Sequence, residues 1–128
     1  MGDQKTILVV DDEPDVVIYL TTLFEDHGFN TMEAEDGIKA LDLAKKCKPD
    51  LITLDITMPE QSGFKTYRYL KSDIELKNVP VIIITAMGES IGNVINKFTG
   101  FPQPEGFMSK PINQQELIDL ASNLTYDL

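Results

Sequence analysis

The stretch Ile7-Leu8-Val9-Val10-Asp11-Asp12-Glu13-Pro14 decides the fold of this chain. Its first four residues are apolar and mostly β-branched, which is typical of a strand buried on both faces of a parallel sheet. Pro14 suits the first turn of a helix, where a backbone N–H is not needed. The stretch therefore predicts a buried strand that leads almost directly into a helix, with three carboxylates at the junction.

The same alternation of strand and helix continues along the chain. Strands of the buried type are predicted at residues 51–54 and 81–84, and more mixed strands, nearer the sheet edges, at 31–34 and 106–109. Apolar residues at helical spacing follow each strand and are expected to form the inner faces of five helices. These residues are Val16, Leu20, Leu23 and Phe24; Ile38, Leu41 and Ala44; Phe64, Tyr67, Leu70 and Ile74; Ile91, Val94, Ile95 and Phe98; Leu117, Leu120, Ala121 and Leu124.

Five strand–helix repeats predict an α/β fold with right-handed crossovers. The natural closure is a doubly wound, flavodoxin-like (βα)5 arrangement, in which a five-stranded parallel sheet has the order 2-1-3-4-5. We expect residues 1–128 to form a single domain with its core at about 5–125, since a chain of this length can bury a core without disulfides or metal.

Composition excludes several classes of function. The net charge of −10 and the absence of a Lys/Arg cluster argue against direct binding of nucleic acid. No apolar run approaches the roughly 18 residues of a membrane-spanning helix, so a membrane role is not expected. Cys47 is the only cysteine, which suits a reducing compartment, and we expect a cytoplasmic protein.

Polar residues stand where four of the predicted strands end. Asp11 follows the first strand, Asp55 and Thr85 end the third and fourth, and Lys110 follows the fifth. The ligand crevice of this topology lies at the carboxyl ends of strands one and three, so these side chains should converge. Asp11, Asp12 and Asp55 would repel one another there, with raised pKa values, unless a cation neutralised them. A site with carboxylate oxygen ligands and unfilled coordination positions favours Mg²⁺, which can also bind a phosphoryl oxygen.

This combination predicts phosphoryl chemistry. A carboxylate beside Mg²⁺ can attack phosphorus and form an aspartyl phosphate, and Asp55 is the candidate nucleophile. Lys110 would place its ammonium on the phosphoryl group, and Thr85 would donate its hydroxyl to it. Each residue alone has an ordinary alternative: Asp12 as a helix cap, Thr85 as a strand end, Lys110 as a solvated charge. Their joint placement at one edge of the sheet favours a phosphoryl-transfer site over these separate alternatives.

These residues carry a resemblance to a known family, the receiver domains of two-component response regulators. Residues 7–14 resemble its acidic opening, and 55–63 (DITMPEQSG) resemble its phosphoacceptor motif. Thr85-Ala86 and Lys110-Pro111 resemble its last two signatures. The resemblance covers essentially the whole chain, and it is the ordered set of motifs that makes it specific.

The resemblance implies a phosphoacceptor switch of the chemotaxis type, a single receiver without an output domain. Asp55 would accept a phosphoryl group from a histidine kinase or a histidine phosphotransfer protein. Asp11, Asp12 and Asp55, with the backbone carbonyl of Thr57, would hold Mg²⁺. Beyond self-phosphorylation from small phosphodonors and self-dephosphorylation, no enzyme activity is expected.

The resemblance also implies how the signal leaves the site. Thr85 and Lys110 would bind the phosphoryl group, and the movement of Thr85 would let Phe107 rotate inward. Phe107 has no hydroxyl, so this switch would depend on packing alone. A downstream protein would bind the face formed by the fourth helix, fifth strand and fifth helix. Pro111 is expected to follow a cis peptide bond, which is accessible to X-Pro bonds.

One segment departs from the family pattern. Lys110 follows Thr85 by 25 residues, a few more than usual, and the surplus lies at residues 99–106 before the fifth strand. Phe101 in this segment has two interpretations: it is an anchor for a partner, or it folds back onto the domain. The second interpretation is favoured.

Two other functions remain open from the residues alone. One is a Mg²⁺-dependent phosphohydrolase with an aspartyl-phosphate intermediate, although Thr57 stands where that chemistry usually has a second acid. The other is a receiver-like structural module that takes no phosphate, which the complete set of polar residues disfavours.

Overall fold

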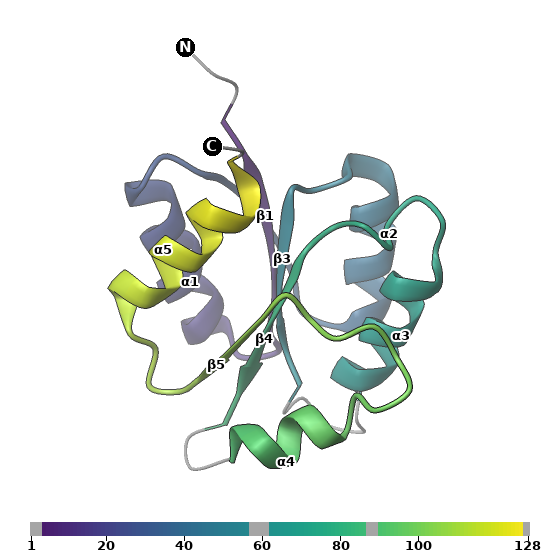
Figure 1. Cartoon of the computed structure of the whole chain (residues 1–128). Coiled ribbons are helices and arrows are strands. Elements are labelled where there is room, and N and C mark those ends of the chain that lie inside the picture. The colour runs from purple at the N-terminus through teal and green to yellow at the C-terminus, as the bar shows by residue number, and fades with distance from the viewer. Residues whose placement is uncertain (1–3, 57–61, 87–89, 127–128) are drawn as a thin grey trace.

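The computed structural model describes residues 4–56, 62–86 and 90–126. Its parallel sheet has the order β2-β1-β3-β4-β5, as predicted, with helices on both faces (Figure 1). The elements are β1 (Thr6–Val10), α1 (Pro14–Asp26), β2 (Asn30–Ala34), α2 (Gly37–Cys47), β3 (Leu51–Asp55), α3 (Ser62–Ser72), β4 (Val81–Thr85), α4 (Ile91–Asn96), β5 (Gly106–Ser109) and α5 (Gln114–Thr125). The predicted doubly wound fold is therefore confirmed.

Side chains of the sheet alternate between two apolar cores. Helices α1 and α5 cover one face, while α2 and α3 cover the other (Figure 1). Ile7 and Val9 of β1 point into the α1/α5 core, whereas Leu8 and Val10 point into the α2/α3 core. Strands β3 and β4 are buried along their whole length, as their apolar runs predict.

Local signals fix where the helices begin. α1 starts at Pro14, and the side chains of Asp36 and Asn113 cap α2 and α5 by accepting hydrogen bonds from Lys39 N (2.8 Å) and Glu116 N (3.0 Å). Gly28, just after α1, has a φ of +90°, a conformation that favours glycine. These signals set where α1, α2 and α5 begin and where α1 ends.

Three predicted core residues are instead exposed, with Ile38 at 83%, Ile74 at 81% and Ile95 at 39%. α2 packs through the small residues Gly37, Ala40 and Ala44, and this turns Ile38 toward solvent. α3 ends at Ser72, where the Asp73 carboxylate accepts a hydrogen bond from Glu75 N (2.8 Å), so Ile74 lies in the following turn. No described helix is long and apolar enough to cross a membrane.

The segment at residues 99–105 docks onto α3. The Tyr67 hydroxyl of α3 donates a hydrogen bond to the Pro102 carbonyl. The buried Lys71 ammonium lies 3.1 Å from the Glu105 carboxylate, which also accepts a hydrogen bond from Val81 N (2.8 Å). These contacts hold the extra residues as part of the fold rather than as an isolated loop.

Thr53 generates a prediction about stability. Its side chain is fully buried in β3, and its hydroxyl has no hydrogen-bond partner among the described residues. Thr53→Val removes this hydroxyl at nearly constant shape, so we expect the free energy of unfolding in urea to rise by about 1 kcal/mol. Val9→Thr, at the neighbouring position of β1, should lower it by about 1–2 kcal/mol. A Thr53→Val protein no more stable than wild type would contradict this account.

Candidate functional site

The carboxyl ends of β1, β3 and β5 bring the predicted charged residues together. The Lys110 ammonium lies 3.3 Å from Asp55 Oδ2 and 3.7 Å from Asp11 Oδ2. Asp55 is the last residue of β3, while Asp11 and Lys110 each follow directly after a strand. The parallel sheet therefore assembles in space a group of residues far apart in the sequence.

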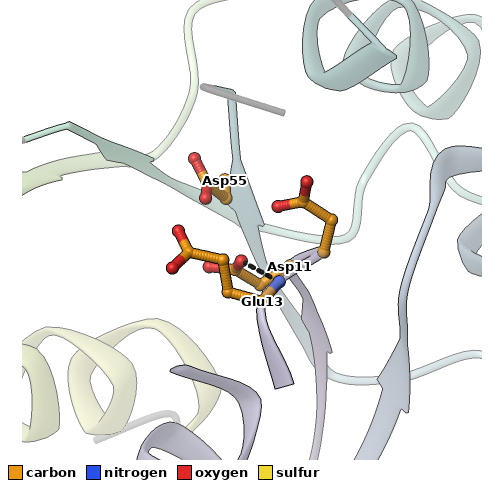
Figure 2. A group of neighbouring side chains, drawn as sticks. Asp11, Glu13 and Asp55 are labelled. Carbon is orange, nitrogen blue, oxygen red and sulfur yellow. Dashed lines mark hydrogen bonds between the residues drawn. The ribbon is translucent and has the colours of Figure 1, made fainter. Parts of the chain in front are cut away.

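Four carboxylates surround this point: Asp11, Asp12, Glu13 and Asp55 each offer one oxygen, and these oxygens lie within 4.8 Å of one another. Figure 2 shows the side chains of Asp11, Glu13 and Asp55 gathered at the strand ends. Asp11 and Asp55 are buried, whereas Asp12 and Glu13 are exposed. Glu13 was not among the predicted ligands, although its place directly after two aspartates signalled it.

The environment of Asp11 favours its protonated form. Burial is the largest cause that raises the pKa of Asp11 from the usual 3.8 to about 7, and the Asp55 carboxylate adds to it. A hydrogen bond from Glu13 N to Asp11 Oδ1 (2.9 Å) opposes the shift (Figure 2). Crowding by Asp55 thus contributes to the raised pKa of Asp11, but less than burial does.

Lys110 compensates part of this negative charge. Burial opposes its charged form, but the carboxylates of Asp55, Asp11 and Glu13 outweigh that cost and raise the pKa of Lys110 above its usual value. Its ammonium also lies 3.8 Å from Glu13 Oε1. The site therefore holds a fixed cation, with more carboxylates around it than one cation neutralises.

The donor set fits a hard divalent cation. Its ligand atoms are all carboxylate oxygens, which suit Mg²⁺ or Ca²⁺ better than softer metals. Asp11 Oδ2 is buried and has no hydrogen-bond partner among the described residues, so it is placed to ligate an ion. Thr57, whose carbonyl was predicted to complete the site, lies outside the described residues.

Thr85 stands beside this cluster at the end of β4. Its backbone carbonyl accepts a hydrogen bond from Lys110 N (3.0 Å), which joins the ends of β4 and β5. The side chain is fully buried, and no described atom pairs with its hydroxyl. A buried donor without a partner costs stability, so this hydroxyl is available to a group that enters the site.

Phe107 lies two residues before the end of β5. It pairs with Ile83 while Thr85 pairs with Ser109, so Phe107 and Thr85 face the same side of the sheet. Its ring lies 5.8 Å from that of Phe98, which in turn contacts Phe64 and Tyr67 of α3 at 5.2 and 4.8 Å. A row of aromatic rings thus leads from β5 to α3.

Two backbone features complete the surroundings. A Cβ atom at Gly63 would lie 2.5 Å from Ile56 Cα and 2.7 Å from the Asp55 carbonyl oxygen. Only glycine therefore lets α3 approach the end of β3 this closely. The Lys110–Pro111 peptide bond is cis.

An open groove of about 400 Å³ borders the carboxylates. It lies between α1 and the end of β2, and its lining includes Asp12, Ile18, Glu33 and Lys39. The acidic cluster is therefore reachable from solvent along this side.

Comparisons with known proteins agree with this geometry. Residues 7–122 match the family model of the response regulator receiver domain. The chain is 36% identical to Protein PilH of Pseudomonas aeruginosa, over 88% of this chain and 90% of that protein. It is 35% identical to the polar-differentiation response regulator DivK of Brucella anthropi, over 96% of this chain and 98% of that protein. The structure of chemotaxis protein CheY4 of Vibrio cholerae shares the fold, with a TM-score of 0.82 at 24% identity over 95% of this chain and 99% of that one.

The Asp11 carboxyl predicts how stability depends on pH without metal. Its pKa is about 7 in the fold against 3.8 ordinarily, so the folded state binds this proton more tightly than the unfolded state does. The resulting stabilisation is full below pH 3.8 and is lost as the pH rises to about 7. We expect the free energy of unfolding, measured by urea denaturation in EDTA, to fall more steeply across this window in wild type than in Asp11→Asn. Parallel curves for the two proteins would contradict this expectation.

Proposed function

Because the chain belongs to the response regulator receiver domain family of two-component systems, we propose that it is a phosphoacceptor signalling switch. In this proposal Asp55 accepts a phosphoryl group from a histidine kinase or a histidine phosphotransfer protein. The observation that carries it is the buried Asp55 carboxylate, 3.3 Å from the Lys110 ammonium and within a cluster of further carboxylates.

The residues suggest how transfer would proceed. A carboxylate oxygen of Asp55 attacks phosphorus, the bond from phosphorus to the donor's imidazole nitrogen breaks, and that nitrogen keeps the electron pair and takes up a proton. Lys110 neutralises charge on the transferred oxygens, and its fixed position means that little reorganisation is needed.

Mg²⁺ is the cation that we propose for the acidic cluster. Asp11, Asp12 and Asp55 would hold it, together with the Thr57 carbonyl that the family resemblance implies. When bound, it would supply positive charge to the phosphoryl oxygens and relieve the repulsion among the carboxylates. Glu13 lies close enough to contribute, directly or through water.

The switch would begin at Thr85. Its buried hydroxyl, without a partner among the described atoms, would donate a hydrogen bond to a phosphoryl oxygen. To make this hydrogen bond, the Thr85 side chain would move toward the phosphoryl group. It would leave space on the face of the sheet where Phe107 also lies. The ring of Phe107 would turn inward, and the face formed by α4, β5 and α5 would present an altered surface to a downstream protein.

The remaining parts of the proposal follow from the same reasoning. We propose one receiver domain across residues 1–128, since a single sheet extends from Thr6 to Ser109 and the family model covers 7–122. We propose a cytoplasmic location and no direct contact with nucleic acid or membrane. Enzyme activity would be limited to self-phosphorylation from small phosphodonors and self-dephosphorylation.

Intact-mass spectrometry tests the phosphoacceptor directly. After incubation with Mg²⁺ and acetyl phosphate, wild type should gain roughly 80 Da, one phosphoryl group in place of a proton. Asp55→Ala should gain nothing, and wild type in EDTA should gain little, because both lack an essential part of the site. Asp50→Ala, a carboxylate just before β3, is the matched control and should behave as wild type.

Other outcomes would contradict the proposal in distinct ways. An adduct that persists in Asp55→Ala would place the phosphoryl group elsewhere. The absence of an adduct, with rapid release of inorganic phosphate, would favour the Mg²⁺-dependent phosphohydrolase. The absence of both would leave a receiver-like module that takes no phosphate.

A further inference from the structure

The outer face of α3 carries positive charge in a strongly acidic protein. The chain has a net charge of −10, yet α3 contains Lys65, Arg68 and Lys71 and no Asp or Glu. Lys71 is buried against Glu105, whereas Lys65 and Arg68 are exposed. Helices α1 and α5 show the opposite pattern, with acidic side chains and no Lys or Arg. The exposed cations of α3 therefore form a local exception to the overall charge.

These cations differ from those of the neighbouring helix in having no carboxylate partner among the described residues. On α2, Lys39, Lys45 and Lys46 form ion pairs with Glu35, Asp73 and Asp42. No described carboxylate lies within 4 Å of the charged groups of Lys65 or Arg68. Their charge is thus available to a group from outside the domain.

Arg68 is held in a conformation suited to binding a carboxylate. Its guanidinium lies over the ring of Phe101, 4.7 Å from the ring centroid. A guanidinium over an aromatic ring still carries N–H groups directed away from the ring, which can make a bidentate contact with a carboxylate. Phe101 is positioned in turn by the docked segment that contains it, where the Tyr67 hydroxyl donates to the Pro102 carbonyl. Because the Arg68 side chain is already held in place, it has less conformational freedom to lose when a carboxylate binds.

Aromatic side chains are exposed beside these charges. Tyr69 is 52% exposed and Phe101 37% exposed. Arg68 and Tyr69 lie three and four residues after Lys65, so both are neighbours of Lys65 on one face of α3. Arg68 connects this face to Phe101 in the segment that follows α4, which passes beside α3 (Figure 1). We call Lys65, Arg68, Tyr69 and Phe101 the α3 surface.

We propose that the α3 surface binds an acidic segment of a partner protein that also carries an aromatic or leucine side chain. Lys65 and Arg68 would pair with its carboxylates, while Tyr69 and Phe101 would contact its apolar side chain. Aromatic residues and arginine are the types that dominate the energetics of protein interfaces. A long polyanion such as DNA fits less well, because the net charge of −10 would repel phosphates beyond this patch.

None of the four residues of this surface belongs to the candidate phosphoacceptor site, and the proposal does not depend on phosphorylation. It also assigns a role to Phe101, which folds back onto the domain and yet remains partly exposed. The two interpretations that the sequence left open for Phe101 are therefore compatible.

Fluorescence anisotropy with a defined probe tests the proposal. The probe is a labelled synthetic peptide in which a tryptophan and a leucine are flanked by glutamates, and a second peptide replaces the glutamates with glutamines. We expect saturable binding of the acidic peptide alone, and weaker binding as salt is raised. Arg68→Glu should weaken binding by about tenfold or more, and Phe101→Ala by several fold.

Matched variants separate this surface from general charge attraction. Lys46→Glu makes the same change of net charge on α2, where Lys46 is exposed and paired with Asp42, and it should alter affinity by less than about twofold. Arg68→Lys keeps the charge but loses the planar contact, so it should weaken binding several fold. Thermal denaturation will establish that each variant is folded, and Arg68→Gln replaces Arg68→Glu if the latter is not.

Four results would overturn the proposal. The first is that wild type does not bind the acidic peptide, and the second is that the glutamine peptide binds equally well. The third is an equal loss of affinity in Arg68→Glu and Lys46→Glu, which would show attraction to charge alone. The fourth is displacement of the peptide by a short DNA duplex at lower concentration, which would assign the surface to nucleic acid.

Discussion

Repulsion among the carboxylates at the carboxyl end of the sheet is the constraint on which the rest of the site depends. Asp11, Asp12, Glu13 and Asp55 lie within a few ångströms of one another, and Lys110 supplies one positive charge against them. Burial is the main reason that the pKa of Asp11 is raised, and repulsion by Asp55 adds to that shift. A cation relieves this repulsion, and a phosphoryl group on Asp55 would add to it, so the site is sensitive to both.

The fold tolerates such a crowded site because helices pack against both faces of the sheet and hold its strands in place. β1, β3 and β4 lie within two apolar cores, and this burial fixes the positions of the residues at their ends. In a doubly wound sheet the crevice lies at the carboxyl ends of β1 and β3, where the strand order reverses. Side chains from separate strands converge there. The aromatic row from Phe107 through Phe98 to α3 gives this end of the molecule a packed connection to its outer surface.

Local patterns were sufficient to predict the strands, their order and the convergence of Asp11, Asp55 and Lys110, because short apolar runs and the topology rules leave few alternatives. The predictions failed where tertiary packing decides. Ile38 has helical spacing but is turned outward by the small residues of α2. The docking of residues 99–105 on α3 depends on the pairing of Lys71 with Glu105 across 34 residues of sequence, for which no local signal exists.

The central claim is that occupancy of Asp55 is sensed by Thr85 and passed to Phe107. A crystal structure with Mg²⁺ and beryllofluoride, a stable analogue of the phosphoryl group, tests it most directly. The account predicts the analogue on Asp55, a hydrogen bond from the Thr85 hydroxyl to a fluorine atom, and the Phe107 ring moved toward the space that Thr85 leaves. An analogue on Asp55 with Thr85 and Phe107 in their present positions would contradict the account.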